Sequence, residues 1–312
     1  MGKWKATKIG KILNRRLLTS FFYKEKNHDI NKSILIAGTG RSGTTWLAEI
    51  LSNYLKYRII FEPFNPRKVS LCKDFLNKQY IPPDSQNKEF YKIFNKTFSG
   101  KIRGRWINQD NRFFRPDGRI IKSIRTSFFL GWFKLNFPQI PIIYILRHPC
   151  AVAVSRARLG WTTDDLDLIL KQKELMNDHL QPYKPLIAGA KTIVERNACI
   201  WAVENFMALK QLNSGDAAVI TYEDLHSSPE KVLQKISTYL GVDLEFKGDS
   251  LRNNPSLTVK SHSNIMQNQD LLSTWKNALT DQEITKVMDI VKKFSLDTIY
   301  DISIMPKKEN FL

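Results

Sequence analysis

Cysteine and histidine are scarce in this chain. Its 312 residues include three cysteines and five histidines. Cys72, Cys150 and Cys199 are odd in number and far apart, with no CxxC pair and no histidine at metal-ligand spacing. The pattern excludes a disulfide framework and gives no reason to expect a metal site. We expect three reduced thiols, as in a cytosolic protein.

Long hydrophobic runs are also missing. No apolar stretch approaches the roughly 18 to 20 residues that a membrane-spanning helix needs. The first 26 residues interleave charged and apolar side chains, whereas a signal peptide has a basic stretch followed by an apolar core. We therefore expect a cytoplasmic protein, and a bacterial cytoplasm is the simplest location.

Acidic residues are too few to balance the basic ones. The chain has 48 Lys and Arg against 30 Asp and Glu, which gives a net charge of +18 and a pI near 9.7. Such an excess favours an anionic partner, namely a polyanion, an anionic surface or a highly charged small ligand.

The basic excess is dense in residues 1–26, which hold eight Lys or Arg against one acid, Glu25. Apolar side chains recur there at helical spacing, at Ile9, Ile12, Leu13, Leu17 and Phe21. These features predict a cationic amphipathic helix. It would either contact an anionic membrane peripherally or pack its apolar stripe on the body of the protein.

A second basic stretch runs from residue 88 to residue 134, with twelve Lys or Arg against three acids. Its aromatic side chains include Trp106, Phe113, Phe114 and Trp132. The mixture suits an anionic or carbohydrate acceptor and also single-stranded nucleic acid. It fits a solvated basic face over ordinary core aromatics equally well. We expect no nucleic-acid partner.

Short β-branched runs alternate with helical patterns along the chain. We expect strands at residues 33–37, 58–61, 119–122, 142–146 and 217–221. We expect helices at residues 44–55, 126–136, 151–158, 165–179, 195–212, 229–240 and 281–294, and loops at 65–87 and 248–270. The first strand, loop, helix and strand predict a βαβ unit, and hence an α/β fold with a central parallel sheet flanked by helices.

No internal repeat or low-complexity segment marks a domain boundary. We expect one domain at residues 31–300, preceded by the basic segment 1–30 and followed by a tail at 301–312. Ligands of parallel sheets bind at the carboxyl ends of the strands, so the segments that follow the expected strands are the candidates for the site.

Three glycines follow the first expected strand. Gly38, Gly40 and Gly43 match the G-x-G-x-x-G fingerprint of dinucleotide-binding folds, and Glu62 lies 19 residues beyond the third glycine. By spacing alone, this fingerprint predicts a nicotinamide-dependent oxidoreductase. The same residues match most of the P-loop pattern of nucleoside triphosphatases, but Thr44 replaces its lysine, which argues against an ATPase or GTPase.

The side chains of this loop favour a different ligand. Arg41, Ser42, Thr44 and Thr45 offer a dense set of hydrogen-bond donors at the start of an expected helix. A dinucleotide turn binds its pyrophosphate mainly through bare backbone amides. The additional side-chain donors suit a compact terminal oxyanion, such as a phosphosulfate group.

The segment from Arg41 to Trp46 resembles the 5′-phosphosulfate loop of sulfotransferases that use 3′-phosphoadenosine 5′-phosphosulfate (PAPS). The segment from Tyr144 to Ser155 resembles the 3′-phosphate site of that family. There, an arginine at the end of a strand and a serine eight residues later clamp the phosphate, and Arg147 and Ser155 have this spacing.

The resemblance covers about residues 33 to 295 and implies the sulfotransferase fold, with PAPS as donor and no metal. The donor-binding residues that it implies are Gly40, Arg41, Ser42, Gly43, Thr44, Thr45, Trp46, Arg147, Ser155, Lys260 and Ser261. Within this set, Trp46 resembles a tryptophan that stacks on adenine. The later segment from Ile220 to Leu225 also resembles the family, and there we expect structure more than chemistry, with Glu223 and Asp224 at the start of a helix.

Sulfuryl transfer needs a base on the acceptor hydroxyl and cations on the departing phosphate. Arg41 is the candidate for the second role. Many relatives of the resembled family use a histidine base, but no histidine lies between His28 and His148. We expect His148 to shape its turn. The segment Phe61-Glu62-Pro63 instead resembles the turn that carries a glutamate base in the carbohydrate-modifying branch.

Glu62 is therefore the predicted base, and Lys122 is a candidate second cation near the transferred group. An ion pair of Glu62 with Arg147 or Lys122 that does no chemistry is the alternative. The leading hypothesis is transfer from PAPS to a hydroxyl of a carbohydrate or glycolipid. The competing hypotheses are a nicotinamide-dependent oxidoreductase and a non-catalytic binder of nucleic acid or anionic membranes.

Overall fold

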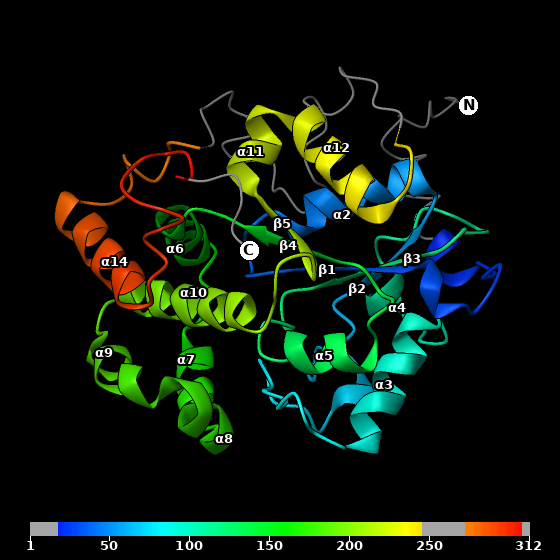
Figure 1. Cartoon of the computed structure of the whole chain (residues 1–312), viewed down its shortest axis with the longest axis horizontal. Coiled ribbons are helices and arrows are strands. Elements are labelled where there is room, and N and C mark those ends of the chain that lie inside the picture. Colours follow the sequence, from blue (N-terminus) through cyan, green and yellow to red (C-terminus); the bar gives the residue numbers. More distant parts are fainter. Residues whose placement is uncertain (1–17, 245–271, 308–312) are drawn as a thin grey trace, which may run out of the picture.

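A five-stranded sheet forms the centre of the protein, whose computed structural model describes residues 18–244 and 272–307 (Figure 1). Its strands are β1 (Ser33–Gly38), β2 (Arg58–Phe61), β3 (Arg119–Ser123), β4 (Ile142–Leu146) and β5 (Ala217–Thr221). They lie in the order β2-β3-β1-β4-β5, and every neighbouring pair is parallel. The predicted α/β fold and its five strands are confirmed to within one residue at each end.

Helices cover both faces of the sheet (Figure 1). One face carries α2 (Thr44–Leu55), α11 (Tyr222–Ser227) and α12 (Pro229–Leu240). The other carries α3 (Lys88–Phe98), α5 (Leu130–Asn136), α6 (Pro149–Arg158), α10 (Ile193–Lys210) and α14 (Asp281–Lys293). Side chains alternate along each strand, so Ile34 and Ile36 of β1 join the first core whereas Leu35 and Ala37 join the second.

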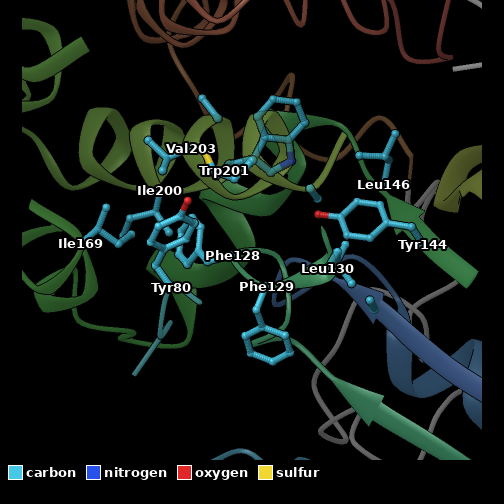
Figure 2. Close-up of a cluster of buried hydrophobic side chains, with 14 of the residues drawn as sticks. Tyr80, Phe128, Phe129, Leu130, Tyr144, Leu146, Ile169, Ile200, Trp201 and Val203 are labelled. Carbon is cyan, nitrogen blue, oxygen red and sulfur yellow. The ribbon is translucent and has the colours of Figure 1, made fainter. Parts of the chain in front are cut away.

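The second core draws on segments that lie far apart in the sequence. Figure 2 shows Ile200, Trp201 and Val203 of α10 beside Tyr80 and Phe128, which come from loops. The C-terminal helix α14 packs against α10 and α6. Shorter helices complete this side: α4 (Arg105–Asn108), α7 (Asp164–Leu170), α8 (Lys173–Leu175), η3 (Met176–Leu180), η4 (Gln181–Tyr183) and α9 (Lys184–Gly189), with single turns at η1 (Ile30–Lys32) and η2 (Ser70–Cys72).

Two helix predictions need correction, and one long helix was not expected. The helix expected over 126–136 begins at Leu130, because the chain first makes a turn in which Phe129 N donates to Thr126 O. The helix expected over 165–179 is broken near Gln172, whose side chain binds the backbone of the loop at 78–80. Helix α3, capped by the Asn87 side chain, was not predicted.

The N-terminal segment also differs from its prediction. The expected helix over 1–26 ends at residue 21 in the described part, and residues 1–17 lie outside it. Tyr23 and Glu25 are buried, and Glu25 forms ion pairs with Arg58 and Arg119 at the start of β2 and β3. The one acid of the segment thus attaches it to the sheet, since a buried carboxylate needs cationic partners.

The aromatic side chains of the second basic stretch divide between core and surface. Trp132 is buried, and Trp106 is half-buried with its ring 5.2 Å from that of Phe61. Phe114 is exposed. Ordinary core packing therefore explains most of the aromatic content of this stretch. Residues 65–87 form the expected loop apart from η2, and the loop expected at 248–270 falls in the undescribed range 245–271.

The three cysteines are buried and free, as expected, and burial raises the pKa of each thiol to about 12. Among residues 18–244 and 272–307, no helix has the length and apolarity to cross a membrane.

Candidate active site

The sheet order brings the predicted site residues to one edge. In the parallel register, Gly38 of β1 pairs with Ile145 of β4, and Phe61 of β2 pairs with Lys122 of β3. The residues that follow each strand therefore lie along the carboxyl edge, where parallel sheets bind ligands. Glu62 stands at the β2 end of this edge, and Arg147 stands on its other side after β4.

The glycine loop joins β1 to α2, and two of its glycines lie where a Cβ would meet β4 or the residue after β5. A Cβ on Gly38 would lie 2.5 Å from the Ile145 carbonyl oxygen. Gly43 has a φ of +90°, and a Cβ there would lie 2.6 Å from the Tyr222 ring. These two glycines hold the loop against β4 and against the residue that follows β5.

The two predicted phosphate-binding motifs meet in space. Arg41 Nε donates a hydrogen bond to Ser155 Oγ at 3.0 Å, and Arg147 Nη1 donates to the Arg41 carbonyl oxygen at 3.0 Å. Burial lowers the pKa of Arg41, and the nearby positive charge of Arg147 lowers it further. In the described part of the chain, neither guanidinium forms an ion pair with a carboxylate. Two cations held together in this way favour an anion between or beside them.

Two donors at this place lack protein partners. Ser42 Oγ and Arg147 Nε are both buried, and neither has a hydrogen-bond partner in the described structure. A buried donor without a partner is destabilising, so such groups in a native site call for a ligand. The donor set, two guanidiniums and hydroxyls at the start of a helix, fits phosphate or sulfate oxygens.

An aromatic surface adjoins the cations. The Arg147 guanidinium lies 4.1 Å from the centre of the Tyr222 ring, and the Trp46 and Tyr222 rings are 5.7 Å apart. Trp46 is half-buried and also packs on the first core. For the segment that contains Tyr222, the sequence predicts structure more than chemistry. Its place directly after β5, on the carboxyl edge, is the signal that could have marked it as a site residue.

Glu62 is fully engaged by cations and a backbone amide. Lys122 Nζ and Arg125 Nη1 each lie 2.6 Å from one of its carboxylate oxygens, and Ile124 N donates to the carboxylate at 3.2 Å. Of the two ion pairs considered from the sequence, the one with Lys122 forms and the one with Arg147 does not. Lys122 is buried rather than solvated. Arg125 was missed, because nothing in the sequence distinguishes it from the other basic residues of its stretch.

The electrostatics of Glu62 follow from these contacts. Burial by itself would raise the pKa of the carboxyl, but the charges of Lys122 and Arg125 outweigh burial and lower it below 4.5. The group is therefore ionised at neutral pH. The backbone at Glu62 has a φ of +42°, which is uncommon for a residue other than glycine and marks a constrained position.

Neighbouring residues have the structural roles that we expected. His148 is buried, its Nδ1 accepts from Cys150 N, and its other ring nitrogen contacts the Asp301 carbonyl oxygen at 2.8 Å. Glu223 lies in the first turn of α11 and accepts from His148 N at 2.9 Å. Lys260 and Ser261 lie outside the described residues.

The strand order overturns the dinucleotide-binding interpretation of the glycines. In dinucleotide-binding folds, β2 lies next to β1, so the acid at its end reaches the ribose of the nucleotide on the β1 loop. Here β3 lies between β1 and β2, and Glu62 instead binds Lys122 of β3. The G-x-G-x-x-G spacing and Glu62 thus occur here in a sheet whose strand order differs from that of dinucleotide-binding folds.

The comparisons with known proteins concern the chain as a whole. No curated protein matches it. It is similar to the sulfotransferase domain of the curacin biosynthetic pathway, with 18% identity over 86% of this chain and 98% of that one and a TM-score of 0.48. It is similar to the sulfotransferase domain of the Synechococcus PCC 7002 olefin synthase, with 18% identity over 87% of this chain and 96% of that one and a TM-score of 0.42. It is also similar to mouse sulfotransferase SULT7A1 complexed with PAP, with 16% identity over 90% of this chain and 88% of that one and a TM-score of 0.44.

The family comparison covers most of the chain. A model of the sulfotransferase family matches residues 33–246, which include all five strands, the glycine loop and the segment with Arg147 and Ser155. The chain therefore belongs to the sulfotransferase family.

Proposed function

We propose that this sulfotransferase moves the sulfuryl group of PAPS to a hydroxyl of a carbohydrate or glycolipid. The observation that carries the choice of donor is the pair of unpartnered buried donors, Ser42 Oγ and Arg147 Nε, beside two guanidiniums that have no carboxylate partner in the described structure. PAPS has two anionic groups, and the site offers a set of donors for each. The residues present therefore fit this nucleotide.

The proposed binding mode follows the residues. Arg147 and Ser155 hold the 3′-phosphate, and the loop from Gly40 to Thr45 holds the phosphosulfate at the start of α2. The adenine stacks in the aromatic surface of Trp46 and Tyr222. The contact between Arg41 and Ser155 supports this mode, because it joins the residues that we propose for the two anions.

We also propose Glu62 as the general base. In the transfer, the acceptor oxygen forms a bond to sulfur, the bond from sulfur to the phosphate oxygen breaks, and the acceptor proton passes to the Glu62 carboxylate. Its low pKa makes Glu62 a weak base toward a free hydroxyl. The hydroxyl becomes much more acidic as its oxygen bonds to sulfur, so a weak base can accept the proton late in the transfer. Lys122 and Arg125 then supply positive charge beside the reacting groups.

The acceptor class rests on two features. The Phe61-Glu62-Pro63 turn resembles the carbohydrate-modifying branch of the family. Trp161, which is 37% exposed, lies so close to the donor loop that a Cβ on Gly40 would be 2.6 Å from its ring. An exposed ring beside the transferred group offers a stacking face for a sugar. Contact of residues 1–26 with an anionic membrane, which would suit a glycolipid, stays a prediction.

A transfer assay tests this function. Purified protein is incubated with ³⁵S-labelled PAPS and panels of glycans, glycolipids and phenols, with Arg147→Ala as the inactive control and Arg158→Ala as a matched control from the exposed end of α6. We expect label on carbohydrate hydroxyls with wild type and Arg158→Ala, and none with Arg147→Ala. Labelling confined to phenols would overturn the acceptor class. Transfer that survives Arg147→Ala would overturn the proposed donor site.

A further inference from the structure

A buried carboxylate lies between the two halves of the proposed site. Glu204 of α10 has one carboxylate oxygen 2.5 Å from Lys78 Nζ and the other 3.1 Å from Arg156 Nη2. The side chains of Glu204, Lys78 and Arg156 are 0%, 4% and 3% exposed. None of the three drew attention in the sequence, because they come from a helix, a loop and another helix that are far apart along the chain.

The two cations extend this cluster to the backbone of both halves of the site. Arg156 Nη2 donates to Thr39 Oγ1 at 2.8 Å, and its Nε donates to the Gly40 carbonyl oxygen at 3.2 Å. Lys78 Nζ donates to the Ile124 carbonyl oxygen at 2.5 Å, and the amide of that same residue donates to Glu62. A continuous set of polar contacts therefore runs from the donor loop to the proposed base.

We propose that Glu204 is a positioning residue that couples the donor loop to Glu62. This inference rests on the proposed function of the site. The carboxylate neutralises two buried cations whose other contacts hold the carbonyl groups of Gly40 and Ile124. Without it, uncompensated charge in the interior would draw Arg156 and Lys78 toward other partners or toward water. Both carbonyl groups would then lose these hydrogen bonds. Small displacements of the reacting groups lower the rate of a transfer reaction strongly.

The protein contains a matched cluster that does not touch the site. Glu25 is also buried and also forms ion pairs with two buried cations, Arg58 and Arg119. The other hydrogen bonds of these arginines go to residues 27, 29, 98, 100, 102 and 108, at the opposite edge of the sheet. Glu25→Gln therefore imposes a comparable loss of buried charge pairing without reaching the donor loop or Glu62.

Hydrogen exchange measures the coupling without requiring a known acceptor. Amide exchange is followed by mass spectrometry with and without saturating adenosine 3′,5′-bisphosphate (PAP), the product nucleotide. In wild type and in Glu25→Gln, we expect PAP to slow exchange in the segment that contains Ile124 by roughly tenfold, within the usual range of coupling between two sites. In Glu204→Gln we expect this distant protection to be lost, while PAP still protects the loop at 39–45.

A second variant tests the same coupling in case Glu204→Gln does not fold. Lys78→Met keeps much of the side-chain length but removes the ammonium that contacts Glu204 and the Ile124 carbonyl oxygen. It leaves Glu204 paired with Arg156, so the contacts of Arg156 with the donor loop are kept. We expect it to lose the protection of Ile124 as Glu204→Gln does. Full protection of that segment by PAP in either folded variant would overturn the inference. If wild type binds no PAP at all, the proposed donor is wrong, and this inference is wrong with it. That result is seen in wild type alone, so it is distinguished from a failure of the coupling, which is seen only in the variants.

Discussion

Arg41 and Ser155 are 114 residues apart in the sequence, yet the Arg41 guanidinium donates to the Ser155 hydroxyl at 3.0 Å. The contact joins the loop after β1 to the helix after β4. Arg147 adds a second link, because it donates to the Arg41 backbone. The two motifs recognised in the sequence therefore lie side by side in the fold. This arrangement supports a ligand with two anionic groups rather than a single phosphate.

Gly43 provides a first test of the loop. Gly43→Ala places a methyl group against the Tyr222 ring at a positive φ, and both effects oppose the native loop. We expect PAP affinity to fall by at least about tenfold, because the loop amides and Tyr222 both move. Calorimetric titration measures this. Gly189→Ala, where a Cβ meets nothing within 4 Å, is the matched control and should bind PAP as wild type does.

Glu62 is tested by separating binding from turnover. Glu62→Gln should lower kcat by about 100-fold or more while leaving PAP affinity unchanged, since a general base contributes on this scale. Because the pKa of Glu62 lies below 4.5, the carboxylate stays ionised above that pH. The wild-type kcat profile should therefore show no loss between pH 8 and about pH 5 that is due to this group. Near wild-type turnover in Glu62→Gln would leave Glu62 as a structural ion-pair partner only.

Trp161 should act on the acceptor and not on the donor. Trp161→Ala removes the exposed ring beside Gly40, so we expect the KM for a carbohydrate acceptor to rise about tenfold, within the range for aromatic contacts. Trp161→Phe should recover part of the loss. PAP affinity, measured on the same preparations, should not change. A fall in PAP affinity that matches the rise in KM would instead assign Trp161 to the nucleotide.

His148 predicts how stability depends on pH. Burial lowers its pKa from 6.5 to about 4, so the unfolded chain binds a proton more readily than the folded protein does. The contribution of neutral His148 to the free energy of unfolding is therefore fully present above pH 6.5 and is lost as the pH falls toward 4. Between pH 7 and pH 5 we expect the free energy of unfolding to fall by about 2 kcal/mol. Urea unfolding at the two pH values measures it.

The control for this prediction is His148→Phe, which keeps an aromatic ring against Trp275, where the native rings are 4.3 Å apart. Its free energy of unfolding should change less between pH 7 and pH 5 than that of wild type. An equal change in both proteins would show that other groups cause the loss.

The strands and the nucleotide motifs were predictable for physical reasons. A parallel strand buried on both faces is a short apolar run, and Ile142–Leu146 and Ala217–Thr221 are such runs. Arg147 and Ser155 could be recognised because Arg147 directly follows β4 and Ser155 lies on the next helix, α6. Local spacing, however, also matched a dinucleotide fold, and the position of β3 between β1 and β2 excludes that fold.

The features that could not be predicted depend on contacts between distant segments. Gln172 binds the backbone near Tyr80 and interrupts a helix that its own sequence favours. Arg125 and Glu204 are ordinary charged residues until the fold places them beside Glu62 and Lys78. No periodicity or motif in one sequence records such partners.

The most direct test of the account is calorimetric titration of PAP into wild type, Arg147→Ala, Ser155→Ala and the control Arg158→Ala. We predict saturable binding to wild type and to Arg158→Ala. Affinity should be at least about tenfold weaker in Arg147→Ala and measurably weaker in Ser155→Ala, because each removes a donor to the 3′-phosphate. Absence of PAP binding to wild type, or equal affinity in all four proteins, would contradict it.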